Sequence, residues 1–146
     1  MTSKTSLPMN TTNNNPIISK PLRYIAIIGS TAKSCRELKL LLNRTSYYCL
    51  IDRYKDSRDL INKESFYLPD CVILASRSLF SMFFISKQAK KLKEIFPGIK
   101  LIIYYNMSKR YPLLEQKNSE FPAFYFSEDE RDQVDRLKKM LQNERI

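Results

Sequence analysis

The sequence predicts an α/β fold in which a doubly wound, parallel sheet of about five strands is covered by helices on both faces. Short apolar runs alternate with helical patterns about five times from Arg23 onward. The predicted strands are apolar along their whole length rather than at every second residue, which is typical of parallel strands buried on both faces. The 146 residues, of which 43% are hydrophobic, are enough for one core. We therefore expect a single domain over residues 22–146.

The first part of this domain contains two strand–helix units. The apolar run YIAIIGS, residues 24–30, predicts the first strand. The helix that follows has an apolar stripe at three- and four-residue spacing, formed by Cys35, Leu38, Leu41 and Leu42. YYCLID, residues 47–52, predicts the second strand. A short helix with Leu60, Ile61 and Glu64 then ends before Pro69, because proline cannot continue a helix.

The middle of the domain is predicted as a third strand and a basic helix. CVILAS, residues 71–76, forms an apolar run of strand length. The helix covers about residues 85–96, and Pro97 with Gly98 terminates it.

The last part begins with KLIIYYN, residues 100–106, which predicts the fourth strand. A weak helix interrupted by proline follows within residues 109–120, and FPAFYFS, residues 121–127, predicts the fifth strand. A clear final helix covers residues 129–142, with one apolar face formed by Val134, Leu137 and Leu141.

Residues 1–21 are expected to form a flexible tail, because they are rich in Thr, Ser and Asn and show no apolar period. The sequence has no continuous apolar run suited to a secretory signal or a membrane span, so we expect a cytoplasmic protein without a membrane partner. An organelle transit peptide is the alternative, since the tail contains no acidic residue, although no arginine precedes Arg23.

Histidine is absent from the sequence, which excludes imidazole-based catalytic triads, histidine metal sites and histidine phosphorelay. Cys35, Cys49 and Cys71 lie in apolar segments without C-x-x-C spacing. They are interpreted as small core residues of a reduced, intracellular protein. We expect neither a metal nor a cofactor.

Four segments, in order and at near-standard spacing, resemble the landmarks of a response-regulator receiver domain. They are IAIIGSTAKSCRELKLLL, LPDCVILAS, KKLKEIFPGIKLIIYYN and FPAFYFSEDERDQVDRLKKML. The Pro-Asp pair followed by aliphatic residues stands where the family leads into its phosphoacceptor aspartate. IFPGIKLIIYYN is similar to receivers that precede a helix-turn-helix domain. The resemblance covers Arg23 to about Leu141 and implies a receiver- or flavodoxin-like (βα)₅ fold.

Every position that carries the family's chemistry is replaced in this sequence. By the resemblance, the acidic pair falls on Gly29 and Ser30 and the phosphoacceptor on Ala75. The switch hydroxyl falls on Tyr105 and the lysine on Ser127. Receiver phosphorylation needs a carboxylate nucleophile and oxygen ligands for Mg²⁺, which these residues do not supply. We therefore expect a degenerate pseudo-receiver that is not an enzyme. An alignment slip of one or two residues is the alternative; the nearby Asp70 matches the ordinary Pro-Asp pair.

The turn GSTAKS after the first strand is not a P-loop, because Ala32 and Ile27 stand where both glycines are required. Ser30 or Thr31 is expected to cap the following helix. A flavodoxin-like phosphate loop is the rival interpretation, with Ser30, Thr31 and Ser34 as donors. Basic residues follow three strands at the carboxyl edge, where such sheets bind ligands. With Ser30 and Thr31 they form a candidate anion-binding edge whose cations are Lys33, Arg77 and Lys109; solvated surface charge is the alternative.

The expected function is a phosphorylation-independent module for protein interaction and dimerisation in signalling or transcriptional regulation, with a protein partner and a homodimer. Receivers of this family associate through the fourth helix, fifth strand and fifth helix. The corresponding residues here are Tyr111, Leu114, Phe124, Asp132, Arg136 and Lys139. Phe124 also stands at the family's aromatic switch position, although plain core packing would explain it equally well.

Two alternative functions remain open at the level of the sequence. The first is a sensor that binds a small anion or a nucleotide at the GSTAKS edge. The second is nucleic-acid binding, which the net charge of +10 favours. No aromatic residues are interleaved in the basic stretch formed by Lys87, Lys90, Lys91 and Lys93, so nucleic acid is not the preferred partner.

Overall fold

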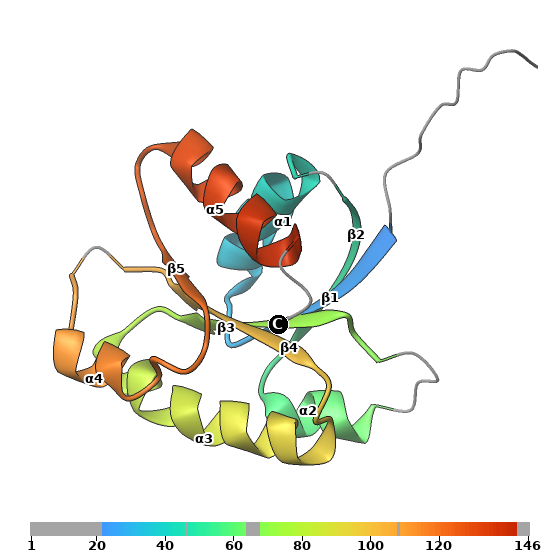
Figure 1. Cartoon of the computed structure of the whole chain (residues 1–146), viewed down its shortest axis with the longest axis vertical. Coiled ribbons are helices and arrows are strands. Elements are labelled where there is room, and N and C mark those ends of the chain that lie inside the picture. The colour runs from blue at the N-terminus through green and yellow to red at the C-terminus, as the bar shows by residue number, and fades with distance from the viewer. Residues whose placement is uncertain (1–21, 46, 64–67, 108, 143–146) are drawn as a thin grey trace, which may run out of the picture.

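The computed structural model describes residues 22–45, 47–63, 68–107 and 109–142, and its centre is a five-stranded parallel sheet (Figure 1). The strand order is β2-β1-β3-β4-β5. The strands are β1 Leu22–Ile28, β2 Tyr48–Tyr54, β3 Cys71–Ser76, β4 Lys100–Tyr105 and β5 Ala123–Tyr125. The chain thus winds in both directions from β1, which confirms the predicted doubly wound sheet.

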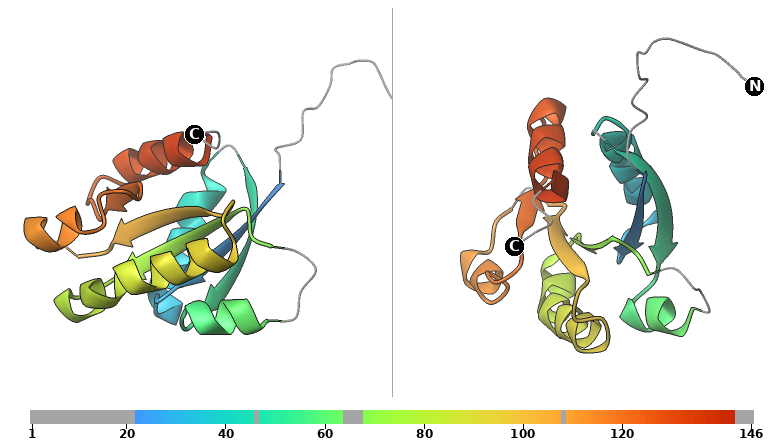
Figure 2. Two further views of the ribbon diagram at one scale, coloured as in Figure 1. Left: turned by 60° about the horizontal axis from the view of Figure 1, so that its bottom comes forward. Right: turned by 45° about the vertical axis from the view of Figure 1, so that its right-hand side comes forward.

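Helices cover both faces of the sheet. On one face lie α1 (Ala32–Asn43) and α5 (Glu130–Gln142), and on the other lie α2 (Ser57–Asn62), α3 (Leu79–Ile95) and α4 (Pro112–Gln116). Figure 2 shows this three-layer arrangement from two further directions. Among the described residues, no helix is both long enough and apolar enough to cross a membrane.

Each face of the sheet has its own hydrophobic core, because successive side chains of a strand point to opposite faces. Ile25 and Ile27 point toward α1 and α5, whereas Ala26 and Ile28 point toward α2 and α3. The predicted stripes of both helices are confirmed as buried: Cys35, Leu38, Leu41 and Leu42 of α1, with Val134, Leu137 and Leu141 of α5. Of the three cysteines, Cys35 and Cys71 are buried and Cys49 is only half-buried.

The third helix begins earlier than the sequence predicts. Ser78 caps it, since its Oγ accepts from the Ser81 backbone N–H at 3.2 Å and the Ser81 hydroxyl reciprocally accepts from the Ser78 N–H at 3.2 Å. This serine-serine capping box starts the helix at Leu79, not near Ile85 as expected. Three phenylalanines, Phe80, Phe83 and Phe84, therefore lie on this helix ahead of its lysines.

The weak fourth helix is confirmed as a short one, and the fifth strand is only Ala123–Tyr125, shorter than the predicted residues 121–127. The predicted final helix is confirmed, beginning one residue later at Glu130. The predicted tail, residues 1–21, and Glu64 of the second helix lie outside the described residues.

Candidate functional site

The carboxyl edge of the sheet brings Gly29 of the β1–α1 turn against the end of β3. Gly29 has a φ of 88°, a conformation that L side chains rarely adopt. A Cβ atom at this position would lie 2.8 Å from the carbonyl oxygen of Ala75. Because this oxygen belongs to the backbone of a central strand, it cannot move aside as the end of a flexible side chain could. The position that the resemblance assigns to an acidic residue is therefore one where any side chain is obstructed.

The end of β3 offers no carboxylate. Ala75 is buried and pairs with Tyr104 of β4. The next residue, Ser76, is fully buried, and its hydroxyl lies 3.0 Å from the Ser81 hydroxyl. An alignment slip of up to two residues reaches only Ile73, Leu74, Ser76 and Arg77. Within the described part of the chain, no three His, Cys, Asp or Glu side chains gather in a way that could hold a metal ion.

Tyr105, at the switch position of the resemblance, is buried at the end of β4. Its ring stacks on that of Tyr125 in β5, with centroids 5.1 Å apart and planes 17° apart. Ser127, at the lysine position, instead begins the turn into α5. Its hydroxyl accepts from the Asp129 backbone N–H at 3.1 Å, and its carbonyl accepts from the Gln133 amide at 2.9 Å.

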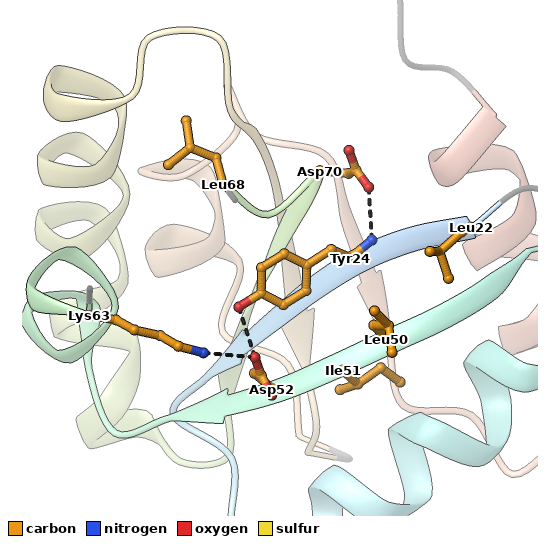
Figure 3. Close-up of a pocket in the computed structure, with 8 residues that line it drawn as sticks. All are labelled: Leu22, Tyr24, Leu50, Ile51, Asp52, Lys63, Leu68 and Asp70. Atoms are coloured by element: carbon orange, nitrogen blue, oxygen red, sulfur yellow. Dashed lines mark hydrogen bonds and ion pairs between the residues drawn. The ribbon is translucent and has the colours of Figure 1, made fainter. Parts of the chain in front are cut away.

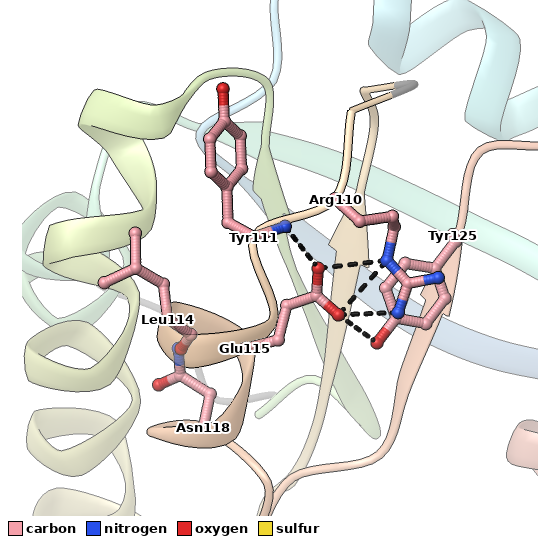
Figure 4. A network of polar contacts seen from close by, with 6 residues as sticks. All are labelled: Arg110, Tyr111, Leu114, Glu115, Asn118 and Tyr125. Carbon is pink, nitrogen blue, oxygen red and sulfur yellow. Dashed lines mark hydrogen bonds and ion pairs between the residues drawn. The ribbon is translucent and has the colours of Figure 1, made fainter.

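A polar network locks the connection between β4, α4 and β5 (Figure 4). Glu115 accepts from the Arg110 guanidinium at 2.6 and 3.0 Å, from the Tyr125 hydroxyl at 3.0 Å and from the Tyr111 backbone N–H at 3.0 Å. Arg110 also lies over the Tyr125 ring, 3.7 Å from its centroid. The hydrogen bonds from Arg110, with those from Tyr111 and Tyr125, lower the pKa of the Glu115 carboxyl to about 2. The network thus stays ionised down to strongly acidic pH.

Sequence reasoning missed Glu115 and Tyr125 as partners. The one available signal was an acidic residue in the first turn of a helix that begins with Pro112, where a carboxylate is favoured. Nothing in the sequence places Tyr125 beside it, since that contact depends on the pairing of β4 with β5.

The turn GSTAKS caps α1 as predicted. The Thr31 hydroxyl accepts from the Ser34 backbone N–H at 3.0 Å. Ser30 is different, because its hydroxyl oxygen is buried and has no hydrogen-bond partner among the described residues. Two guanidinium groups hold this turn: Arg77 donates to the Gly29 carbonyl at 3.4 Å and Arg53 to the Ser30 carbonyl at 3.2 Å.

The predicted basic edge is therefore assembled in part. Lys33, in the first turn of α1, and Arg77, on the connection after β3, are both exposed. Lys109 lies on the connection after β4, where its ammonium is 5.4 Å from the centroid of the Tyr111 ring. Arg53, which lies in β2 and also contacts the turn, was not predicted.

The expected dimer face is exposed only in part, and Phe124 needs a correction. Phe124 is fully buried and stacks on Tyr104, with ring centroids 4.4 Å apart, because strand alternation points it toward α1 and α5. Leu114 and Tyr111 are partly buried against the core on the α3 side, whereas Leu113 is 79% exposed.

The α5 part of this face lies at the surface. Asp132 and Arg136 form an ion pair at 3.2 Å one helical turn apart, with side chains 44% and 53% exposed. Lys139 is exposed on the same helix. Charges of both signs therefore remain available there.

A second polar cluster lies near the amino-terminal ends of β1 and β3, beside a cavity of about 560 Å³ (Figure 3). Asp52 accepts from the Tyr24 hydroxyl at 2.8 Å and from the Lys63 ammonium at 3.0 Å. Burial, with hydrogen bonds to Tyr54 and Asp52, raises the pKa of Tyr24 well above its usual range. Because Tyr24, Asp52 and Lys63 are hydrogen-bonded to one another, the cluster connects the end of α2 to the sheet. No sequence motif marked it.

Comparisons with known proteins concern the fold. A family model described as "Uncharacterized protein family (ORF7) DUF" matches residues 75–145. No curated protein matches the chain.

Solved structures are similar at low sequence identity. A response regulator receiver protein from Pseudoalteromonas atlantica is 10% identical with a TM-score of 0.61, over 84% of this chain and 99% of that one. A response regulator in red light signaling of R. palustris is 14% identical with a TM-score of 0.61, over 85% and 96%. A pilus assembly protein from Caulobacter crescentus is 8% identical with a TM-score of 0.57, over 84% and 95%. The chain therefore has the receiver-like α/β fold that its sequence predicts.

Proposed function

We propose that this chain is a pseudo-receiver that works without phosphorylation, as a protein-interaction module in signalling or transcriptional regulation, and that it is not an enzyme. The observation that carries the proposal is the obstructed Gly29 position beside Ala75. A receiver needs carboxylates at this edge to hold Mg²⁺ and to accept the phosphoryl group. Here one position has no room for a side chain, and the other presents a methyl group in the core.

The network around Glu115 supports a permanently active surface. It joins Arg110, Tyr111 and Tyr125 through a carboxylate that stays ionised, and Tyr125 also stacks on the buried Tyr105. In the family that the sequence resembles, phosphorylation shifts association through the face formed by the fourth helix, fifth strand and fifth helix. A region held by several charge-assisted hydrogen bonds supports a module with one constant surface.

Phosphorylation chemistry is tested directly with acetyl phosphate and Mg²⁺. We expect no increase in intact mass, because Gly29, Ser30 and Ala75 provide no carboxylate to accept the phosphoryl group or to hold Mg²⁺. An active receiver domain in the same reaction serves as the positive control. A stoichiometric mass increase that hydroxylamine removes would contradict the proposal, since hydroxylamine cleaves acyl phosphates.

The proposed module forms a homodimer through α4, β5 and α5. Leu113 supplies exposed apolar surface, and Asp132, Arg136 and Lys139 supply charges of both signs. A two-fold interface brings each patch onto its own copy, so acidic residues can face basic ones. Leu113 is the residue to test, because Leu114, although expected at this face, is partly buried against the core.

Sedimentation velocity tests the dimer. We expect Leu113→Asp or Arg136→Glu to shift the wild-type dimer toward monomer, and the control Lys39→Glu on α1 to leave it unchanged. The folds should survive, because Leu113 is exposed and an exposed i,i+4 ion pair contributes only about 0.3–0.5 kcal/mol. A wild-type chain that stays monomeric at high micromolar concentration in physiological salt would refute the dimer.

A second candidate function, binding of a small anion or nucleotide at the GSTAKS turn, is favoured by the Ser30 hydroxyl, which is buried without a partner among the described residues. Arg53 and Arg77 lie at the same turn. We expect inorganic phosphate or a nucleotide to raise the melting temperature of the wild type and to raise that of Ser30→Ala and Arg77→Gln less. Equal melting temperatures with and without these anions would exclude this function.

A further inference from the structure

The outer face of α3 carries an exposed aromatic cluster. Phe80 is 73% exposed, Phe83 58% and Phe84 45%, and the rings of Phe80 and Phe84 meet edge to face with centroids 5.3 Å apart. The core is filled by the opposite side of the helix, where Met82, Ile85, Ala89 and Leu92 are all buried. The three phenyl rings therefore add little to the core.

Lysines continue this face along the same helix. Phe80, Phe84, Lys87 and Lys91 follow one another at spacings of four, three and four residues, so they form one line on the helix surface. Phe83 and Lys90 lie beside this line, and Glu94, three residues after Lys91, continues it. Phe80 and Lys87 are separated by about 10 Å along the axis, at 1.5 Å per residue. The face thus has an aromatic block followed by a basic block.

The aromatic block also extends beyond the outer line of the helix. Leu79, the first residue of α3, is 40% exposed. Exposed apolar side chains gathered at one end of a helix are typical of an interaction surface.

We propose that this face of α3 docks an acidic amphipathic helix of a partner protein, with apolar anchors over Phe80, Phe83 and Phe84 and carboxylates over Lys87, Lys90 and Lys91. The inference rests on the proposed role as an interaction module and names its partner surface and partner chemistry. Charge complementarity carries the choice, because the chain has a net charge of +10 and this face carries three lysines against one acidic residue, Glu94.

The order of the two blocks argues against a membrane. An interfacial helix keeps its cations at the margins of its apolar face, where they reach the lipid headgroups. Lys87 and Lys91 instead lie in line with Phe80 and Phe84. A flat membrane that buried the rings would desolvate the two ammonium groups at the same depth.

Other occupants fit less well for the same reason. A second copy packed in parallel would put lysines against lysines, and an antiparallel copy would put phenyl rings opposite lysines. A single-stranded nucleic acid would find its aromatic platforms clustered at one end rather than spaced between the cations.

Binding of a designed probe peptide tests the proposal. The probe is a labelled four-turn helix that has leucine and phenylalanine on the first two turns and glutamate on the same face of the next two. We expect a fluorescence anisotropy signal with a dissociation constant on the order of 10 μM. Phe83→Ser and Lys87→Glu should each weaken binding about tenfold, whereas the matched α1 variants Leu40→Ser and Lys39→Glu should not change it. Melting temperatures of all four variants establish that they fold.

Three results would overturn the inference. The first is equal binding of a peptide with lysine in place of every glutamate. The second is Phe83-dependent co-sedimentation with phosphatidylglycerol vesicles, or Phe83-dependent binding of single-stranded DNA, without any binding of the probe. The third is Phe83-dependent self-association, which would make a second copy the occupant. None of these results affects the phosphorylation test, so failure of this surface and failure of the pseudo-receiver proposal are distinguishable.

Discussion

Replacement of Gly29 by alanine is expected to lower the free energy of unfolding by about 3 kcal/mol. Two causes combine at this residue. A φ of 88° disfavours any L side chain, and the new Cβ would lie 2.8 Å from the Ala75 carbonyl oxygen. Because that oxygen belongs to β3, which is paired on both sides, the strand cannot shift without disturbing β1 and β4.

Gly98 provides the matched control. It has nothing within 4 Å of the position that a Cβ atom would take, so Gly98→Ala should change the free energy of unfolding by no more than about 0.5 kcal/mol. Urea unfolding followed by circular dichroism measures both variants. Equal midpoints for Gly29→Ala and Gly98→Ala would show that the turn relaxes, and would remove the steric argument for the pseudo-receiver.

An aspartate at position 29 tests whether a carboxylate alone is enough for Mg²⁺ binding at this site. Gly29→Asp restores a carboxylate where the receiver family has one, yet it introduces a larger side chain into the same obstructed position. We expect greater destabilisation than for alanine and no stabilisation by Mg²⁺. The backbone at Gly29 thus itself disfavours an acidic side chain at this position.

The strands and the sides of the long helices could be predicted from the sequence, because both depend on local periodicity. Apolar runs identified the central strands, and three- and four-residue spacing identified the buried sides of α1 and α5. The start of α3 was wrong for a local reason. Its capping box uses Ser81 where Glu or Gln is the usual partner, so Ser78 was overlooked.

The late helix start expected from the sequence also left the aromatic face of α3 unpredicted. With the helix starting near Ile85, the basic stretch had no aromatic neighbours on its face. Because α3 in fact starts at Leu79, three phenylalanines precede the lysines on this face. The sequence signalled only the position of Glu115 in the first turn of α4; its partners could not be predicted, because they depend on which strand pairs with β4 and on how Pro112 begins α4.

The sequence left three roles open for Phe124, namely dimer face, aromatic switch and plain core, and truncation of this side chain distinguishes a core role from the other two. We expect Phe124→Ala to lower the free energy of unfolding by about 3–5 kcal/mol, because a fully buried aromatic ring would leave a cavity beside Tyr104, Val134 and Leu137. The loss includes the stacked contact with Tyr104, at a centroid distance of 4.4 Å.

Phe126, two residues further along, is the matched control because it is 44% exposed and its backbone N–H, which donates to the Tyr105 carbonyl at 2.9 Å, survives truncation. Phe126→Ala should cost about 1 kcal/mol or less. Urea unfolding at low and high protein concentration decides between core and interface. Truncation of a core residue lowers the unfolding midpoint equally at both concentrations. Truncation of an interface residue lowers it mainly at high concentration, where the dimer forms. The core assignment of Phe124 would be contradicted if Phe124→Ala lowered the free energy of unfolding only at high protein concentration, or by no more than Phe126→Ala does.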